Sequence, residues 1–279
     1  MSSIPNIITT HGGGLLSKSD HGLWVRPYPN PLGLPPYTMR ILFERVGYDP
    51  VSDGGWKTGA HWRQVSTDPN IWDYTRESTN WSNEFQQTTT EPSSGRPEFQ
   101  VLGANTTGVT NMSGMFRSTH LHSTVYFDTS AVTDMSYMFA YCGSRYSTDP
   151  SRFTWCPNFD TSNVTNMRGM FMYTDLRAMP DLDTHNVTNM REMFLMSSSP
   201  VFADRCLTKI RLYDTSSVQD VRSMFENQRY VAGGALAFYN QLANQQTPPT
   251  QHSYCFYRTG DQTTVGQEEL AQIPSDWQQ

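Results

Sequence analysis

The sequence predicts an α/β fold, a solenoid in which short strand, turn and short helix units stack side by side. Two observations carry this prediction. A phrase of 13 residues recurs through the middle of the chain, and its cleanest copy, FDTSNVTNMRGMF, spans residues 159–171. The apolar positions fall at the same places in each copy, so every copy has one edge to bury. A single unit cannot bury that edge alone, but stacked units can.

The phrase has five recognisable copies and one degenerate copy. The other recognisable copies span residues 182–194, 127–139, 213–225 and, shortened, 108–116. In the degenerate copy, which ends at residue 85, Trp81 takes the place of Met167 and Phe85 that of Phe171. The residues expected in the repeat core are Val109, Met112, Phe116, Val132, Met135, Phe139, Val164, Met167, Phe171, Val187, Met190, Phe194, Val218 and Phe225.

The order of residues within one copy predicts its local structure. The apolar residues of 164–171 fall at i, i+3, i+6 and i+7, which predicts one stripe on a short helix. Asn163 precedes that stripe and is a good N-cap residue. Residues 159–161 are typical of the end of a short strand, with Asp160 bonding to nearby backbone in the turn.

The spacing of the copies predicts alternating loops. Successive terminal phenylalanines, from Phe116 to Phe225, are separated by 23, 32, 23 and 31 residues. Phe85 lies 31 residues before Phe116 and continues this alternation. Insertions at one place in alternate units should project from the same side of a solenoid. The loops expected to do so lie at residues 86–98, 141–157 and 196–208.

The phrase Asp-Thr-Ser-Asn-Val-Thr-Asn-Met-x-x-Met-Phe resembles the BspA-like leucine-rich repeat family of bacterial surface proteins, over residues 67–230. Some Met and Phe residues stand where ordinary leucine-rich repeats have Leu. Such repeats occur on secreted or lipid-anchored proteins of gut and oral bacteria and mycoplasmas, and in phages of gut bacteria. The resemblance implies a leucine-rich-repeat-like solenoid used for adhesion or binding, with no catalytic residues to carry over.

The segments that flank the repeats differ from them in composition. Residues 1–36 are rich in Gly and Pro and predict an extended arm that is ordered by a neighbour or lies on its own domain. Residues 37–66 predict a β-rich N-terminal cap, with a strand over 37–47. Trp56 and Trp62 then suggest a hairpin with an aromatic plug, or alternatively an aromatic platform for carbohydrate.

The C-terminal segment, residues 231–279, predicts a helical cap. The repeated phrase stops after Val231 in this interpretation. An amphipathic helix is expected over residues 235–243, ended by the prolines at 248–249. A second short helix is expected over residues 265–273.

The composition and the first residues limit the classes of function that are expected. Charged residues make up 16% of the chain and the net charge is −6, so no basic excess favours nucleic acid or an acidic membrane. The first residues lack the features of an export signal, and no stretch approaches transmembrane length. A surface-type repeat made without an export signal fits a phage virion protein. The alternative is a bacterial surface adhesin whose signal has been removed.

Recurring polar residues offer weak candidate sites. Arg168, Arg191 and Arg222 occupy the same place in three successive copies, where they would either be solvated or engage an acidic glycan or a subunit. One aspartate per copy would either bond in a turn or stack into a calcium ladder, namely Asp128, Asp160, Asp183 and Asp214. Among seven histidines, the closeness of His120 and His122 is too little evidence for a metal site.

The cysteines leave two alternatives open. Cys142 and Cys156 are placed to bridge the first long loop, or to remain free and buried in a protein folded in a reducing cytoplasm. No CxxC pair supports a zinc site, and no cofactor is expected.

These observations favour a non-catalytic virion protein, whether fibre, tail or capsid-decorating. The expected partners are host-surface glycan or protein and other virion proteins, the latter through the arm at residues 1–36, with a homo-oligomer formed. No nucleic acid and no membrane insertion are expected. A glycan-processing enzyme is a third alternative, but it needs paired carboxylates that stand apart from the aspartates of the repeat.

Overall fold

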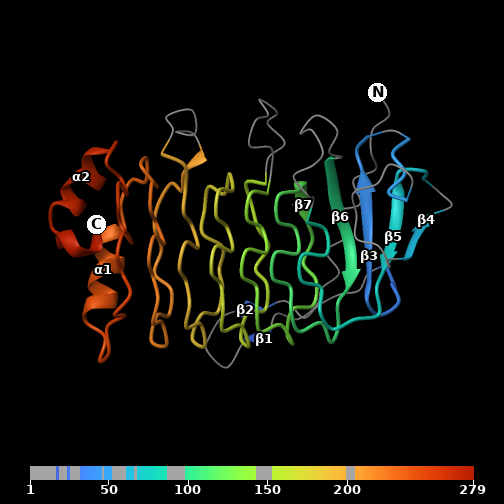
Figure 1. The fold of residues 1–279 in the computed structure, drawn as a ribbon, viewed down its shortest axis with the longest axis horizontal. Coiled ribbons are helices and arrows are strands. Elements are labelled where there is room, and N and C mark those ends of the chain that lie inside the picture. Colours follow the sequence, from blue (N-terminus) through green and yellow to red (C-terminus); the bar gives the residue numbers. More distant parts are fainter. Residues whose placement is uncertain are drawn as a thin grey trace.

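The computed structural model describes residues 17–18, 24–25, 32–45, 47–51, 61–65, 68–86, 98–142, 153–198 and 205–279. These residues form a mixed α/β structure with a five-stranded mixed sheet, a separate pair of two-residue strands and two short α-helices. In Figure 1 the five-stranded sheet lies at one end of an elongated molecule and the helices lie at the other, with the repeated phrase between them.

The five-stranded sheet has the strand order β4-β5-β3-β6-β7. Its central strand β3 pairs antiparallel with β5 and β6, β4 pairs antiparallel with β5, and β6 pairs parallel with β7. The side chains of Met39, Ile41 and Phe43 point into the core, as their alternation predicts. The strands are β3 (Thr38–Phe43), β4 (His61–Gln64), β5 (Ile71–Thr75), β6 (Glu98–Asn105) and β7 (His120–Thr124).

Aromatic rings fill the space between the sheet and the first copy. Trp62 on β4 packs at 4.9 Å from Tyr74, whose ring lies 4.7 Å from Phe85. The hydroxyl of Tyr74 donates to the fully buried Glu84, and burial raises the pKa of that hydroxyl. The expected hairpin is therefore the β4–β5 pair, and Trp62 is used in packing. Trp56 lies outside the described residues.

Within the described residues, the copies of the phrase lie side by side in parallel. Six isolated bridges join equivalent residues of successive copies, in the order Asn80, Asn111, Asp134, Asn166, Asn189, Asp220 and Gln251. Alternate N–H groups donate to the next copy. Those of Met167, Gly169 and Phe171 reach its carbonyls at 2.9, 2.8 and 3.0 Å. The backbone of one copy is thus bonded to the next much as in a parallel sheet.

The short helix predicted within each copy is wrong. Met170 donates to the carbonyl of Met167 at 3.1 Å and closes a tight turn in which Gly169 has a φ of +59°. A left-handed residue at this place interrupts any right-handed helix and suits the third position of a type II turn. A left-handed residue recurs three positions after each of the seven bridge residues, at Asn83, Gly114, Tyr137, Gly169, Glu192, Ser223 and Tyr254.

Two further expectations for the phrase are corrected. Asn163 is no N-cap, because its side-chain amide donates to the carbonyl of Ser130 in the preceding copy at 2.8 Å. No strand is formed over residues 159–161. There the hydroxyl of Thr161 donates to the carbonyl of Asp183 in the next copy at 2.7 Å, and Thr129 and Thr184 make the equivalent bond.

The phenylalanines form one buried column. Successive ring centroids lie 5.4 to 6.0 Å apart, with rings within 19° of parallel, through Phe85, Phe116, Phe139, Phe171, Phe194, Phe225 and Phe256. Every Val, Met and Phe expected in the repeat core is at most 3% exposed. Burying such a column removes apolar surface from water along the whole stack.

The C-terminal segment contains both expected helices, α1 (Ala235–Ala243) and α2 (Thr264–Leu270), followed by a 3-10 helix η4 over Ser275–Trp277. The prediction that the phrase stops after Val231 is wrong. A seventh copy begins at Gln251, and the N–H of Phe225 donates to Cys255 within it at 2.9 Å. The N–H of Phe256 in turn donates to the carbonyl of Trp277 at 3.1 Å.

Some expectations fall largely outside the described residues. These include the central parts of the three loops and most of the arm over residues 1–36. Within the arm, β1 (Ser17–Lys18) pairs antiparallel with β2 (Trp24–Val25), which the Gly and Pro content does not predict. Among the described residues, no helix combines the length and the apolar character that crossing a membrane requires.

Candidate binding surface

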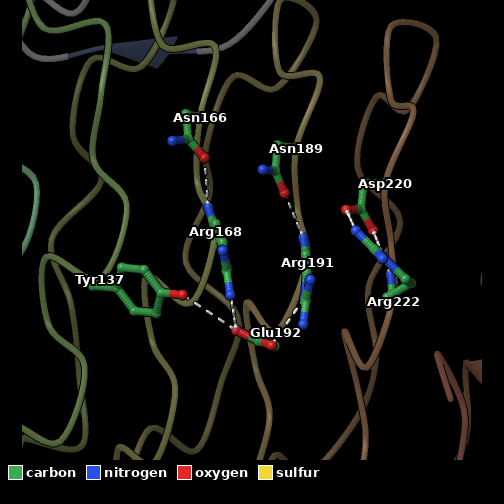
Figure 2. A network of polar contacts seen from close by, with 8 residues as sticks. All are labelled: Tyr137, Asn166, Arg168, Asn189, Arg191, Glu192, Asp220 and Arg222. Carbon is green, nitrogen blue, oxygen red and sulfur yellow. Dashed lines mark hydrogen bonds and ion pairs between the residues drawn. The ribbon is translucent and has the colours of Figure 1, made fainter. Parts of the chain in front are cut away.

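The predicted arginine column is present, and each arginine faces a carboxylate (Figure 2). Nε of Arg168 lies 3.3 Å from one carboxylate oxygen of Glu192, and Nε of Arg191 lies 2.9 Å from the other. Arg222 instead turns to Asp220, with two hydrogen bonds at 3.0 and 2.6 Å. The structure therefore brings Arg168 and Arg191 together around one glutamate and leaves Arg222 in a separate pair.

The backbone explains why the three arginines share one place. The backbone at each arginine is held in place, because its N–H donates to the side chain two residues earlier, at 3.0 to 3.1 Å. Those acceptors are the bridge residues Asn166, Asn189 and Asp220. A side chain two residues after each bridge therefore points to the same side of every copy.

Tyr137 extends this network in Figure 2. Its hydroxyl donates to Glu192 at 3.3 Å, and the guanidinium carbons of Arg117 and Arg168 lie 5.1 and 5.4 Å from its ring centroid. Burial, together with the nearby carboxylate, raises the pKa of Tyr137. Glu192 and Asp220 offset two of the three positive charges of the column, which weakens its attraction for an acidic ligand.

The recurring aspartates bond within turns. In the copy with Asp160, one carboxylate oxygen accepts from the N–H and the hydroxyl of Ser162, at 3.1 and 2.7 Å. Asp128 and Asp214 make the same pair of bonds with the serines two residues on. Among the described residues these aspartates join no group of three candidate metal ligands.

The opposite side of the stack carries different chemistry. We call residues 154–158, 176–181 and 207–212 the variable face. These segments are neighbours, because Arg177 donates to the carbonyl of Thr154 at 3.4 Å and Thr208 donates to that of Arg177 at 2.9 Å. Trp155 is 65% exposed on this face and Leu212 is 57% exposed. A single exposed leucine is ordinary, but tryptophan is highly buried on average, so the exposure of Trp155 is the more informative of the two.

A groove of about 200 Å³ opens between two segments of the variable face and the phrase beside them, at residues 181–184 and 211–214. Asp181 and Arg211 form an ion pair at its rim. The carboxylate of Asp183 is 6% exposed, and its Oδ1 accepts from Nδ1 of His185 at 2.6 Å. Its Oδ2 is buried with no hydrogen-bond partner among the described residues. A ligand hydroxyl or amine would satisfy such an oxygen.

All four cysteines are buried thiols, and none of them forms a disulfide. The thiol of Cys142 donates to the carbonyl of Phe116 at 3.1 Å, and burial raises the pKa of Cys156 well above its usual value. The sequence left open whether Cys142 and Cys156 are thiols or form a disulfide, and the structure shows thiols. A protonated, enclosed thiol is a packing group and a poor nucleophile.

Sequence reasoning missed Trp155, Leu212 and the groove. Trp155 and Leu212 lie in segments that have no periodic pattern, and Trp155 falls inside a stretch interpreted as a loop. The groove is lined partly by those segments and partly by residues 182–184 and 213–214 of the phrase. An isolated tryptophan among polar residues is a weak signal, since most tryptophans are buried. The replacement of serine by His185 in one copy was a second signal, because Ser130, Ser162 and Ser216 hold that place elsewhere.

A family model described as "Mycoplasma protein of unknown function, DUF285" matches the chain twice, over residues 79–194 and 146–259. The second match reaches past residue 231 and includes the seventh copy. Neither the curated proteins nor the solved structures give a match. The two family matches together cover residues 79–259, which is more than half of the 279 residues. The chain therefore belongs to the DUF285 family.

Proposed function

We propose that this protein is a non-catalytic binding protein built as a leucine-rich-repeat-like solenoid. In this proposal, residues 37–66 and 231–279 cap the two ends of the repeats at 67–230, which the seventh copy extends. The variable face contacts host-surface glycan or protein. The observation that carries the proposal is the exposure of Trp155, at 65%, on the face where the groove at residues 181–184 and 211–214 opens.

The chemistry of the variable face supports recognition of a polar ligand. The carbonyl of Thr154, the residue before Trp155, accepts from the backbone N–H of Arg177. The carbonyl of Arg177 in turn accepts from the backbone N–H of Thr208. Lys209 follows Thr208 and is exposed. An exposed aromatic ring stacks on sugar rings, and the exposed basic residues Arg177 and Lys209 of the same face attract acidic groups. A glycan that bears carboxylate or sulfate groups is therefore the ligand class we favour.

The carboxylates of the groove support binding over hydrolysis. Glycoside hydrolysis uses two carboxyl groups that flank the scissile bond, one of them free to act as an acid. Here Asp181 is paired with Arg211 and Asp183 is paired with His185. These pairs suit carboxylates that accept hydrogen bonds from a ligand, and they do not supply a proton donor and a nucleophile.

The setting we propose is a phage virion, in a fibre, a tail or a decoration of the capsid, with the arm at residues 1–36 binding other virion proteins or further copies of the chain. A bacterial cell surface is the alternative, and the description of the matching family as a Mycoplasma protein favours it. The genes beside the coding sequence discriminate between the two. Virion genes support the first setting, and bacterial surface-protein genes would overturn it.

A glycan array tests the binding proposal. The full chain should bind a subset of acidic glycans, and Trp155→Ala should weaken that binding by about 30-fold, as removal of an aromatic anchor does. The matched control is Tyr254→Ala, which removes an exposed aromatic ring from the phrase side of the stack. Its effect should stay within about twofold. Equal effects of the two variants, or silence of the array, would count against the variable face as a glycan site.

The arm is tested separately. Removing residues 1–36 should abolish incorporation into the particle or the oligomer and leave glycan binding by the variable face unchanged. Incorporation of the truncated chain at the level of the full chain would show that the arm is no anchor.

A further inference from the structure

Three potential metal ligands meet at one corner of the five-stranded sheet. Glu44 follows the last residue of β3, Glu98 is the first residue of β6, and His122 lies within β7. One ligand atom from each residue can be chosen so that all three atoms lie within 4.8 Å of one another. This is the single such group among the residues that the structure describes. It lies outside the variable face and the arginine column.

The sheet brings these residues together through its own hydrogen bonds. The N–H of Glu44 donates to the carbonyl of Glu98 at 2.9 Å, which fixes the ends of β3 and β6 beside each other. Between β6 and β7, Phe99 is opposite Leu121 while Gln100 is opposite Ser123. His122 is therefore an extra residue in the ladder. A bulge of this kind re-aims a side chain, and bulges are frequent next to functional sites.

The re-aimed imidazole lies between the two carboxylates. Nδ1 of His122 is 2.9 Å from a carboxylate oxygen of Glu44, and Nε2 is 3.8 Å from Oε2 of Glu98. The His122 side chain is 10% exposed, so its position is set by the surrounding protein. Gln100 donates to the same oxygen of Glu44 at 2.7 Å, and Ser123 donates to Gln100 at 3.2 Å. The carboxylate beside the imidazole is thus itself held in place.

The distance of 3.8 Å between Nε2 of His122 and Oε2 of Glu98 decides how this corner of the sheet is interpreted. It is too long for a hydrogen bond, but it is close to the distance between two ligands that share one ion with bonds of about 2.1 Å. Glu44 also occupies the position of the carboxylate that orients a metal-binding histidine from its other nitrogen. Two carboxylates this close repel each other unless a cation lies near them.

We propose that Glu44, Glu98 and His122 form a divalent metal site. In this site Nε2 of His122 and the Glu98 carboxylate are the protein ligands, and Glu44 orients the imidazole through Nδ1. A donor set of imidazole nitrogen and carboxylate suits Zn²⁺, whereas Ca²⁺ prefers oxygen ligands alone. The bound ion joins β6 to β7, and Glu44 at the end of β3, 78 positions from His122, holds the imidazole in place. Glu98 is 36% exposed, so water completes the coordination from the solvent side.

The test uses the full chain after removal of metal with a chelator. Titration with ZnCl₂ in a calorimeter should show one ion bound per chain, and the melting temperature should rise with added Zn²⁺. Glu98→Gln keeps the shape of an exposed side chain and should weaken Zn²⁺ binding by at least about tenfold. His122→Gln should weaken it further. The matched control is His61→Gln, on the opposite edge strand β4, which should bind as the unaltered chain does.

Three results would overturn the site. The first is no saturable Zn²⁺ binding below about 1 mM, which would leave His122 as a bridge between two glutamates. The second is unchanged binding in Glu98→Gln, which would place the ion elsewhere, for instance at a cysteine. The third is a preference for Ca²⁺ over Zn²⁺ that does not depend on His122. If His122→Gln fails to fold, the exposed Glu98 still decides the outcome.

Discussion

The two sides of the stacked copies are held together in different ways. On the phrase side, alternate N–H groups of each copy donate to the next, so the backbone is bonded across the whole stack. On the variable face the backbone bonds are scattered. There Thr208 donates to Arg177, but the N–H of Asp181 donates to the side chain of Asn158 at 3.0 Å.

This difference explains which parts of the sequence repeat. A backbone ladder with a buried threonine and a filled core demands the same residue types at those places in the copies. The left-handed place in the turn is less strict and holds Gly, Asn, Ser, Glu or Tyr. A face held by individual side chains makes no such demand and can vary. In a repeat protein, specificity for a partner is therefore best placed on the variable face.

The largest effect is expected in the phenylalanine column. Phe171 lies 5.8 Å from Phe139 and 5.6 Å from Phe194, so Phe171→Ala leaves a cavity between neighbours that cannot close over it. The free energy of unfolding should fall by about 3–5 kcal/mol in urea titrations. Trp155→Ala on the variable face should change it by less than about 0.5 kcal/mol. Similar losses for the two variants would remove the distinction between the sides.

The buried threonines should come next. Thr161→Val keeps the shape of the side chain but leaves the carbonyl of Asp183 without its donor. The free energy of unfolding should fall by about 1–3 kcal/mol. Thr154→Val, at an exposed position on the variable face, is the control and should be nearly neutral. A neutral Thr161→Val would mean that these hydroxyl bonds add nothing to the stacking.

The left-handed turn residues allow a test in both directions. In Gly169→Ala the new Cβ would lie 2.5 Å from the ring of Tyr137, at a φ of +59°, so the variant should lose about 1–2 kcal/mol of stability. Ser223 holds the equivalent place with a φ of +54°, so Ser223→Gly should be stabilising by up to about 1 kcal/mol. Thermal unfolding measures both. If Gly169→Ala raised the stability and Ser223→Gly lowered it, the left-handed turn would not be the geometry that the copies share.

Alkaline pH should destabilise both sides alike. Burial raises the pKa of Cys156 beside the variable face, and of Cys255 in the seventh copy, well above the usual value. In the unfolded chain these thiols lose their protons at ordinary pKa values, so that above pH ~8.5 the unfolded state binds fewer protons and stability falls as pH rises. The expected loss between pH 7 and pH 9 is on the order of 1 kcal/mol for each buried thiol.

Urea midpoints at pH 7, 8 and 9 measure this effect. Cys255→Ala and Cys156→Ala should each make the pH dependence shallower by a similar amount. A midpoint that does not move up to pH 9 would show that the thiols ionise as readily in the folded protein as in the unfolded chain.

The smallest effect is expected in the arginine column. Glu192→Gln removes the charge that Arg168 and Arg191 share at 3.3 and 2.9 Å. Because these side chains are partly exposed, the loss of stability should stay below about 1 kcal/mol and should shrink further in high salt. A loss of several kcal/mol would mean that this network, and not the column beneath it, organises the phrase side.

Much of the architecture could be predicted from the sequence, but the turn geometry could not. The recurrence of Val, Met and Phe predicts the buried column, and alternation predicts β3. The spacing of Met167 and Met170 is the same in a helix as in a tight turn closed between residues i and i+3. The glycines at 114 and 169 were the available hint that a left-handed residue is needed there.

Other features could not be predicted because they depend on residues that lie far apart in the chain. The seventh copy keeps only Thr250 and Phe256 in common with the cleanest copy, although Phe256 lies 31 residues after Phe225, as the spacing would suggest. Glu44 and His122 meet because strand order places them together, and no local pattern in the sequence records that order. Exposure of Trp155 likewise follows from packing between copies, which composition does not reveal.

Distances between spin labels test the stacking of the copies most directly. Thr79, Thr165, Gln219 and Thr250 are exposed and each precedes the bridge residue of its copy. With one label at residue 79, pulsed electron resonance should give distances to residues 165, 219 and 250 of about 14, 24 and 29 Å, which are 3, 5 and 6 steps of about 4.8 Å. Distances that follow the number of intervening residues, or that fail to increase from one copy to the next, would contradict the account.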